Sequence, residues 1–213
     1  GKLKELHLEG IDGLTINSIP LLISTTTALE ALNLAKCYQM TDAVLHALAT
    51  RLQPVNKRVE LRDLNMMGCT RLTDAGVGEL LQKCTGLATL NLRFCTGVGG
   101  MAFSPLQTIS LSSLTYLDVS GMKIHDLDLS WITGGCRNLK TLFLERIHTI
   151  TNDSMSLISD NLHALESLSL NGCINIGDKG IFFLLGYQKG LRQINKKSDP
   201  ATSPTSGSGK KKA

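Results

Sequence analysis

The sequence predicts an α/β solenoid, in which short strand–helix units stack into a curved horseshoe segment. Three observations predict it: a leucine pattern recurs about every 26 residues, each copy opens with the alternation of a strand, and most copies continue into an apolar pattern of helical spacing. We therefore expect a parallel β-sheet on the concave face and helices on the convex face.

The recurring pattern places leucine, or a close relative, at its first, fourth and sixth positions and often cysteine at its ninth. Successive first leucines lie 25 to 27 residues apart, except for the 32 that separate Leu29 from Leu61, where extra residues fall around 53–60. An eighth copy, which begins at Leu191, stops short. The pattern defines one repeat domain over residues 1–195. Its seven copies begin at Leu3, Leu29, Leu61, Leu87, Leu114, Leu139 and Leu165.

Each unit contains a strand followed by a helix. Alternation such as Leu90-Asn91-Leu92 is typical of a strand with one buried face. In most units a polar pair then precedes apolar residues at helical spacing, as Thr73-Asp74 precedes Val77, Leu80 and Leu81. We expect such a threonine to cap its helix by accepting a hydrogen bond from a free backbone N–H.

The units must stack, because one strand and one helix cannot bury their apolar faces alone. Helices pack about 10 Å apart and strands about 4.8 Å apart, so we expect the stack to curve with the sheet inside. One unit departs from the plan, because Gly97, Gly99, Gly100 and Pro105 stand where a regular helix should begin.

The residues between the leucines of each strand are mostly polar, whereas a parallel sheet covered on both faces reads apolar throughout. This polarity indicates a sheet face open to water or to a partner. Arginine and aromatic residues, which are typical of interface hot spots, come close together there, although Tyr116 and Phe143 could simply pack on each other. The predicted partner-binding residues are Asn65, Met67, Asn91, Arg93, Tyr116, Asp118, Phe143 and Glu145.

Six cysteines raise the alternatives of a metal site or a disulfide framework. Zinc ligands usually come in close pairs such as C-x-x-C, whereas the nearest two cysteines here, Cys84 and Cys95, lie 11 residues apart. We predict instead small core side chains with weak S–H donors for buried carbonyls, in a reducing compartment, and no metal. The predicted structural cysteines are Cys37, Cys69, Cys84, Cys95, Cys136 and Cys173.

The sequence predicts no catalysis. Its five histidines are scattered without metal-ligand spacing, and neither a nucleophile elbow nor a phosphate-binding loop is present. We therefore expect a protein that is not an enzyme, with no catalytic residues, no cofactor and no small-molecule substrate.

Charge and hydropathy argue against two classes of partner, nucleic acids and membranes. The net charge of +4 lies in residues 196–213, which hold five lysines and one aspartate and read as a disordered tail, so residues 1–195 hold 17 basic and 17 acidic residues. We expect no specific nucleic-acid partner, because the repeat body has no basic excess. No apolar run reaches the roughly 18 residues that a membrane helix needs, so we expect no membrane partner.

The repeats resemble the cysteine-containing class of leucine-rich repeats found in F-box/leucine-rich-repeat proteins, over residues 1–195. Besides the cysteines, Met40-Thr41-Asp42, Leu72-Thr73-Asp74 and Ile176-Gly177-Asp178 are similar to the I-T-D-x-G element of that class. The resemblance implies a protein-binding domain of a ubiquitin-ligase substrate receptor. The same repeats also resemble those of axonemal scaffold proteins, which implies the alternative of a structural subunit in a cytoskeletal assembly without ligase activity.

The sequence also departs from that class. Ile11, Met122 and Ile147 replace the ninth-position cysteine, and no F-box is visible. The chain begins inside a repeat with Gly1, so we expect it to be part of a longer protein. The expected location is intracellular and cytoplasmic, with the cytoskeleton or cilium as the location that the scaffold alternative implies.

Overall fold

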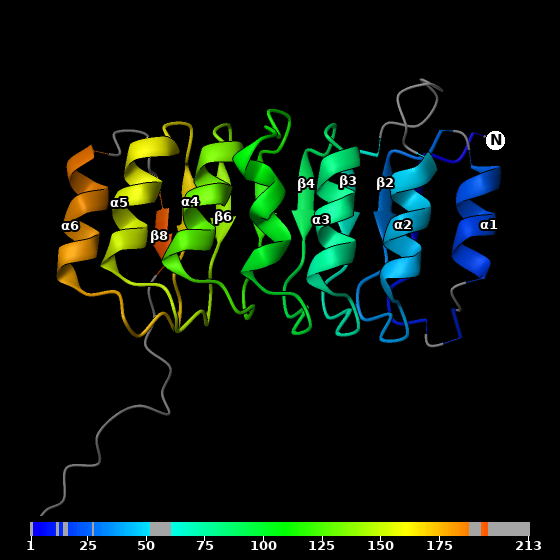
Figure 1. Ribbon diagram of the computed structural model, residues 1–213, viewed down its shortest axis with the longest axis horizontal. Coiled ribbons are helices and arrows are strands. Elements are labelled where there is room, and N and C mark those ends of the chain that lie inside the picture. The colour runs from blue at the N-terminus through cyan, green and yellow to red at the C-terminus, as the bar shows by residue number, and fades with distance from the viewer. Residues whose placement is uncertain are drawn as a thin grey trace, which may run out of the picture.

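The computed structural model describes residues 2–11, 13–14, 17–26, 28–51, 61–187 and 193–195. Eight short strands form one parallel sheet in sequence order, and the helices lie in a row on one side of it (Figure 1). This confirms the predicted leucine-rich-repeat solenoid. The extra residues around 53–60, the predicted tail at 196–213 and Leu191 lie outside the described residues.

Every repeat contributes one strand of three residues. The strands are β1 (Glu5–His7), β2 (Ala31–Asn33), β3 (Asp63–Asn65), β4 (Thr89–Asn91), β5 (Tyr116–Asp118), β6 (Thr141–Phe143), β7 (Ser167–Ser169) and β8 (Gln193–Asn195). The helices between them are α1 (Ser18–Thr25), α2 (Asp42–Arg51), α3 (Asp74–Lys83), η1 (Gly100–Gln107), α4 (Asp126–Gly135), α5 (Asn152–Asn161) and α6 (Asp178–Tyr187).

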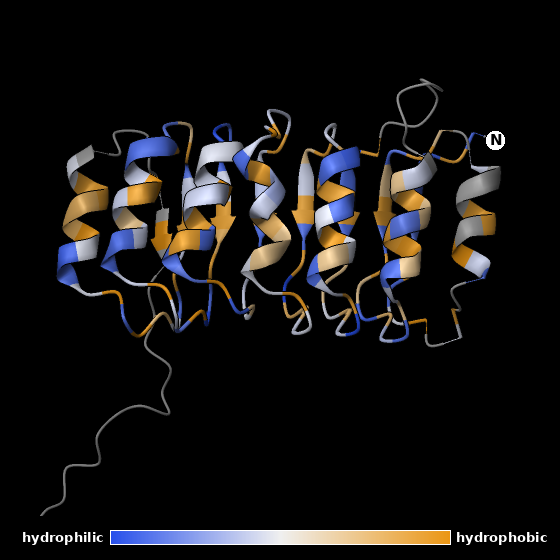
Figure 2. Ribbon diagram, in the orientation of Figure 1, coloured by the Kyte–Doolittle hydropathy of each residue, from blue (hydrophilic) through white to orange (hydrophobic). Residues whose placement is uncertain are grey.

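The core lies between the sheet and the helix row. The strands pair without a slip, so their central residues align from Leu6 in β1 to Ile194 in β8. From β2 to β7 these central leucines are buried, together with the apolar side of each helix. Figure 2 shows apolar residues along the strands and mixed apolar and hydrophilic residues on the outward side of the helices.

The six cysteines are buried and form no disulfide. Four of them occupy the ninth position of their repeats, where each Sγ–H donates to a backbone carbonyl of the preceding repeat. The Sγ–O distances are 3.1 Å from Cys37 to Leu8, 3.2 Å from Cys69 to Leu34, 3.1 Å from Cys95 to Met66 and 2.9 Å from Cys173 to Leu144. The thiol therefore supplies a hydrogen bond to a carbonyl buried between repeats.

A second ladder joins the starts of the helices. The carboxylate of Asp42 accepts from the N–H and the hydroxyl of Thr73 in the next repeat, at 2.9 and 2.5 Å. Asp126 accepts in the same way from Thr151, at 2.9 Å for both donors. The amide oxygen of Asn152 accepts from the N–H of Gly177 at 3.0 Å. The first residue of each of these helices, Asp42, Asp126 and Asn152, thus holds the following repeat.

This ladder corrects the expected role of the threonines. The side chain of Thr73 makes no capping hydrogen bond to its own helix, and its hydroxyl donates to Asp42. The hydroxyl of Thr151 does both: it donates to Asp126, and it caps its own helix by accepting from the N–H of Asp153 at 3.2 Å. The prediction from local sequence missed the acceptor, which lies one repeat away.

The unusual unit between β4 and β5 folds as a 3₁₀-helix, η1, with Pro105 inside it. Its first residue, Gly100, has no side chain that could hold the next repeat. The acceptor comes instead from the next repeat itself, where the Asp128 carboxylate accepts from the N–H of His125 at 2.8 Å within its own helix start. A side chain at position 100 would collide with this Asp128 carboxylate.

The turn after each strand requires a left-handed backbone residue. Such a residue precedes the ninth repeat position in all seven complete repeats: it is glycine at Gly10, Gly68, Gly121 and Gly172, and a larger residue at Lys36, Phe94 and Arg146. The left-handed conformation costs a non-glycine residue about 1–2 kcal/mol. Phe94 adopts it directly after Arg93, whose guanidinium lies over the Phe94 ring.

Candidate functional site

The candidate site lies on the face of the sheet that the helices leave uncovered. We call it the strand face and define it by the first and last residues of β1 to β7 and the second residue after each strand. Among the predicted site residues, the structure brings Arg93, Tyr116, Asp118, Phe143 and Glu145 together on β4 to β6 and the turns that follow. Asn65 is the last residue of β3 and Met67 lies in the turn that follows it, outside this central cluster.

Three predicted binding residues have a role in the backbone turns. The side-chain oxygen of Asn65 accepts from the N–H of Met67 at 3.1 Å, and that of Asn91 accepts from the N–H of Arg93 at 2.9 Å. Asp118 Oδ1 accepts from the N–H of Ser120, also at 2.9 Å. Each bond bridges two residues along the chain and starts the turn that ends the strand.

Phe143 occupies the same strand position in β6, where no such oxygen is available. The N–H of Glu145 donates instead to Ser120 Oγ on the neighbouring repeat, at 3.1 Å. Ser120 is consequently buried, although the sequence places it on the outward side of its strand. The turn after β6 is thus held from a neighbouring repeat, and position 143 is free to carry an aromatic ring.

An ion cluster covers Ser120. Arg93 Nη1 lies 2.7 Å from Glu145 Oε2 and 3.8 Å from Asp118 Oδ2, so the guanidinium spans from the β4 repeat to the β6 repeat. Glu145 Oε1 also accepts from Ser169 Oγ at 2.7 Å and from Asn171 Nδ2 at 3.0 Å. The side chains are 24% exposed for Arg93, 17% for Glu145 and 6% for Asp118, so the cluster is largely shielded from water.

The two carboxylates of the cluster have opposite pKa shifts. Burial raises the pKa of Asp118 above its usual value, and the hydrogen bonds of Ser120 and the charge of Arg93 offset this only in part. Burial would also raise the pKa of Glu145, but hydrogen bonds from Ser169, Arg93 and Asn171 outweigh it and lower that pKa. The surroundings therefore favour the charged form of Glu145 and disfavour the charged form of Asp118.

Two half-buried aromatic rings lie beside the cluster. The ring centroids of Tyr116 and Phe143 are 5.6 Å apart with a tilt of 47°, so the expected packing between them exists. Arg93 also lies over the ring of Phe94, 4.8 Å from its centroid. Gly121 leaves room for that ring, since a side chain there would collide with it.

Sequence reasoning did not select Phe94, Ser120, Ser169 and Asn171 as site residues. For Ser120, Ser169 and Asn171, alignment of the repeats could have placed them beside the predicted site residues. Ser169 aligns with Phe143 in the pairing of β6 with β7, and Ser120 and Asn171 occupy the same repeat position as Glu145. Phe94 gave no such signal, because its position follows from the left-handed turn.

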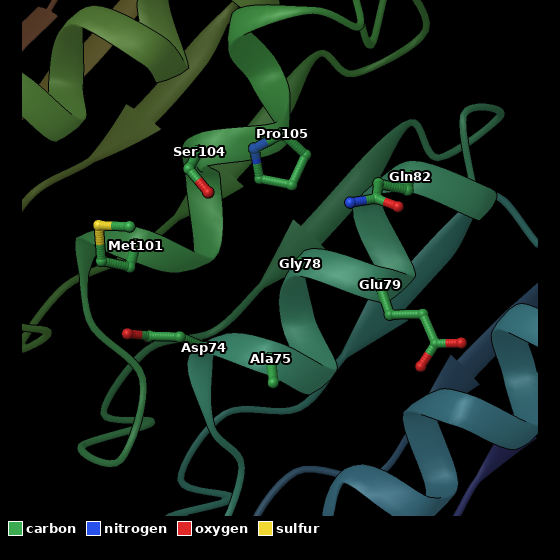
Figure 3. A pocket seen from close by; sticks show the side chains of 8 residues that line it. All are labelled: Asp74, Ala75, Gly78, Glu79, Gln82, Met101, Ser104 and Pro105. Carbon is green, nitrogen blue, oxygen red and sulfur yellow. The ribbon is translucent and has the colours of Figure 1, made fainter.

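The helix side carries an open groove of about 310 Å³ between α3 and η1 (Figure 3). It forms where Gly78 faces Pro105, and the half-exposed Met101 lies at its edge. Its acidic groups already have partners: Asp74 accepts from the N–H of Gly99 at 2.5 Å, and Glu79 lies 2.9 Å from a ring nitrogen of His46. Both carboxylates that line the groove are therefore engaged within the protein.

Neither a metal centre nor a membrane helix is found within the described ranges. No three His, Cys, Asp or Glu side chains there are grouped so that they could hold a metal ion. No helix in the same ranges is both long and apolar enough to cross a membrane.

Comparison with known proteins places this chain next to two longer relatives, and no protein-family model matches it. It is 27% identical over 179 residues, 82% of the chain, to "DNA repair protein rhp7" of Schizosaccharomyces pombe. It is also 27% identical over 145 residues, 61% of the chain, to "Lysine-specific demethylase 2A" of Xenopus tropicalis. The matches span 30% and 12% of those two proteins. Among solved structures, a chain of the yeast Rad7 and Elc1 complex aligns with 97% of this chain and over 80% of its own length, at a TM-score of 0.41 and 14% identity.

Proposed function

We propose that this domain is a binding module, not an enzyme, and that its strand face docks a protein partner. The observation that supports this most directly is the cluster of Arg93, Glu145, Tyr116 and Phe143 on a sheet face that no helix covers. Arginine and aromatic side chains held in fixed positions and partly shielded from water are typical of interface hot spots. The groove between α3 and η1 on the helix side, by contrast, is lined by two carboxylates that are already paired within the protein.

We further propose that the domain recognises substrates for a ubiquitin ligase. The resemblance of the repeats to those of F-box/leucine-rich-repeat proteins supports this role. In that arrangement an F-box elsewhere in the intact protein would tether the strand face and its bound substrate to the ligase. The alternative of a scaffold subunit in a cytoskeletal assembly uses the same face but has no ligase components.

The test is affinity purification of the intact protein from its own cells, followed by mass spectrometry. Recovery of the F-box adaptor and a cullin supports the receptor role, whereas a stoichiometric set of cytoskeletal subunits without them supports the scaffold. Recovery of neither contradicts both roles.

Two pairs of variants test the strand face in the same experiment. Arg93→Glu and Phe143→Ala change the cluster, and Arg71→Glu and Phe182→Ala are matched changes at exposed positions away from it. We expect the first pair to lose the partner and the second pair to retain it. Equal recovery with all four variants would refute docking at the cluster.

A further inference from the structure

The strand face carries an excess of negative charge. Its residues include one arginine, Arg93, and five carboxylates. At its rim, Lys36 pairs with one of them, Glu9, at 2.8 Å, and Arg146 occupies the same repeat position as Lys36. Five carboxylates thus face three cations, although the charges of residues 1–195 balance. Opposite potentials across an interface favour encounter and select partners, so this face fits a basic surface. The five carboxylates are Glu5, Glu9, Asp63, Asp118 and Glu145.

One of these charges is not needed for the fold. The turn after each strand requires only a side-chain oxygen, which Asn33, Asn65 and Asn91 supply as neutral amides. Asp118 makes the same bond with a carboxylate in a buried position. Arg93 is paired more closely with Glu145, so the cluster has two carboxylates for one guanidinium.

The aromatic pair adds a second, independent feature. Tyr116 and Phe143 have polar sheet neighbours on the strand face, namely Thr89 and Thr141 beside Tyr116 and Ser169 beside Phe143. Two rings in polar surroundings offer little apolar area to an aliphatic side chain. A cation, however, is attracted to the face of an aromatic ring and to carboxylates beside it.

We propose that the partner presents a basic segment to the strand face, with a lysine or arginine side chain over the Tyr116 and Phe143 rings, beside the carboxylates of Asp118 and Glu145. This inference rests on the proposed docking function and names the chemistry of the partner. Asp118 and Glu145 attract the cation, and the rings fix its place. The existing ion pair of Arg93 with Glu145 holds that carboxylate in position.

The experiment uses the full chain, labelled with ¹⁵N, and three synthetic peptides. One peptide consists of four Gly-Ser-Arg repeats, and the others have leucine or glutamate in place of arginine. Amide shifts of residues on β4 to β6 report binding. The test variant Asp118→Asn/Glu145→Gln removes two charges but keeps a side-chain oxygen acceptor at both positions. The control variant Asp153→Asn/Asp160→Asn removes the same charge from exposed positions on α5.

We expect the arginine peptide to shift amides around Tyr116 and Phe143, and the test variant to bind it about tenfold more weakly, while the control variant binds as the wild type does. Equal or tighter binding of the leucine peptide would overturn the proposal. Absence of arginine-peptide binding, or equal weakening in both double variants, would also overturn it. The peptide experiment and the affinity purification can fail separately. If the arginine peptide does not bind but Phe143→Ala loses the partner in the purification, the basic partner is refuted and docking at the strand face is still supported.

Discussion

Arg93 and Glu145 form an ion pair across an intervening strand, with Nη1 and Oε2 2.7 Å apart, although the two residues are 52 positions apart in sequence. The pair covers the buried Ser120, which in turn accepts the hydrogen bond that holds the turn at Glu145. One contact therefore connects three repeats of the solenoid and fixes the centre of the strand face.

Removal of Arg93 should destabilise the domain. In Arg93→Ala the carboxylates of Glu145 and Asp118 remain shielded from water without a cation, so we expect the free energy of unfolding to fall by about 1–3 kcal/mol. Urea unfolding followed by circular dichroism measures this. Arg71→Ala is the control, because Arg71 is exposed and donates to Gln39; its effect should stay within about 0.5 kcal/mol. A similar loss in both variants would contradict the role given to the pair.

Asp118 and Glu145 should influence stability in opposite directions as pH changes. The folded-state pKa of Asp118 is raised, so its ionisation opposes folding once the pH rises through that pKa. The folded-state pKa of Glu145 is lowered, so its favourable contribution is present above the ordinary value of 4.5 and is lost as the pH falls through the lowered pKa.

Two neutral variants test this difference. At pH 7 we expect Asp118→Asn to raise the free energy of unfolding and Glu145→Gln to reduce it. Both differences from the wild type should shrink as the pH falls through the respective pKa values, because the wild-type side chains become neutral. Urea titrations between pH 3 and pH 7 measure the differences. Shifts of the same sign at pH 7 would show that the assignment of the two carboxylates is wrong.

Gly76 should tolerate no side chain. A Cβ there would collide with the Asp42 carboxylate that holds the next repeat, so we expect Gly76→Ala to lower the free energy of unfolding by about 1–3 kcal/mol. Gly134 in α4 has open space around it, and Gly134→Ala should raise stability by about 0.5–1 kcal/mol through its better helix propensity. Thermal unfolding measures the stability of both variants. Equal changes in melting temperature for Gly76→Ala and Gly134→Ala would argue against the hydrogen bonds that link Asp42 to the start of the next helix.

The thiols should be unreactive in the folded protein. Burial raises the pKa of Cys69, Cys84, Cys95 and Cys136 to about 12, and at pH 8 a group with that pKa is ionised in about one molecule in ten thousand. We expect a disulfide reagent to label the cysteines only at the rate of unfolding and to label all six in denaturant. Fast labelling of any of these four in the native state would contradict their burial.

Sequence reasoning located the strands well because their signal is local. The leucines that alternate in each repeat lie within three residues of one another, and the predicted sheet face and helix side follow from that period. The fixed spacing between repeats then gave the stacking and the common position of Cys37, Cys69, Cys95 and Cys173.

The roles of the polar residues were decided by tertiary structure. Thr73 could serve as a cap by its sequence, but its hydroxyl donates to Asp42, 31 residues earlier in the chain. Asp118 was expected on an open face, yet neighbouring repeats bury it, and its carboxylate forms a turn that Asn91 forms with an amide.

There is a physical reason why the fold could be predicted from the sequence and the roles of the polar residues could not. Apolar period and turn chemistry act between residues close in sequence, and they specify the repeat, its register and the face that stays outside. A polar side chain in a solenoid can form its hydrogen bond within its own repeat or with a neighbouring repeat. Which of the two forms depends on the distances between the stacked repeats. The sequence by itself therefore determined the solenoid, whereas tertiary contacts between repeats decided that Arg93, Asp118 and Glu145 form one cluster beside Tyr116 and Phe143.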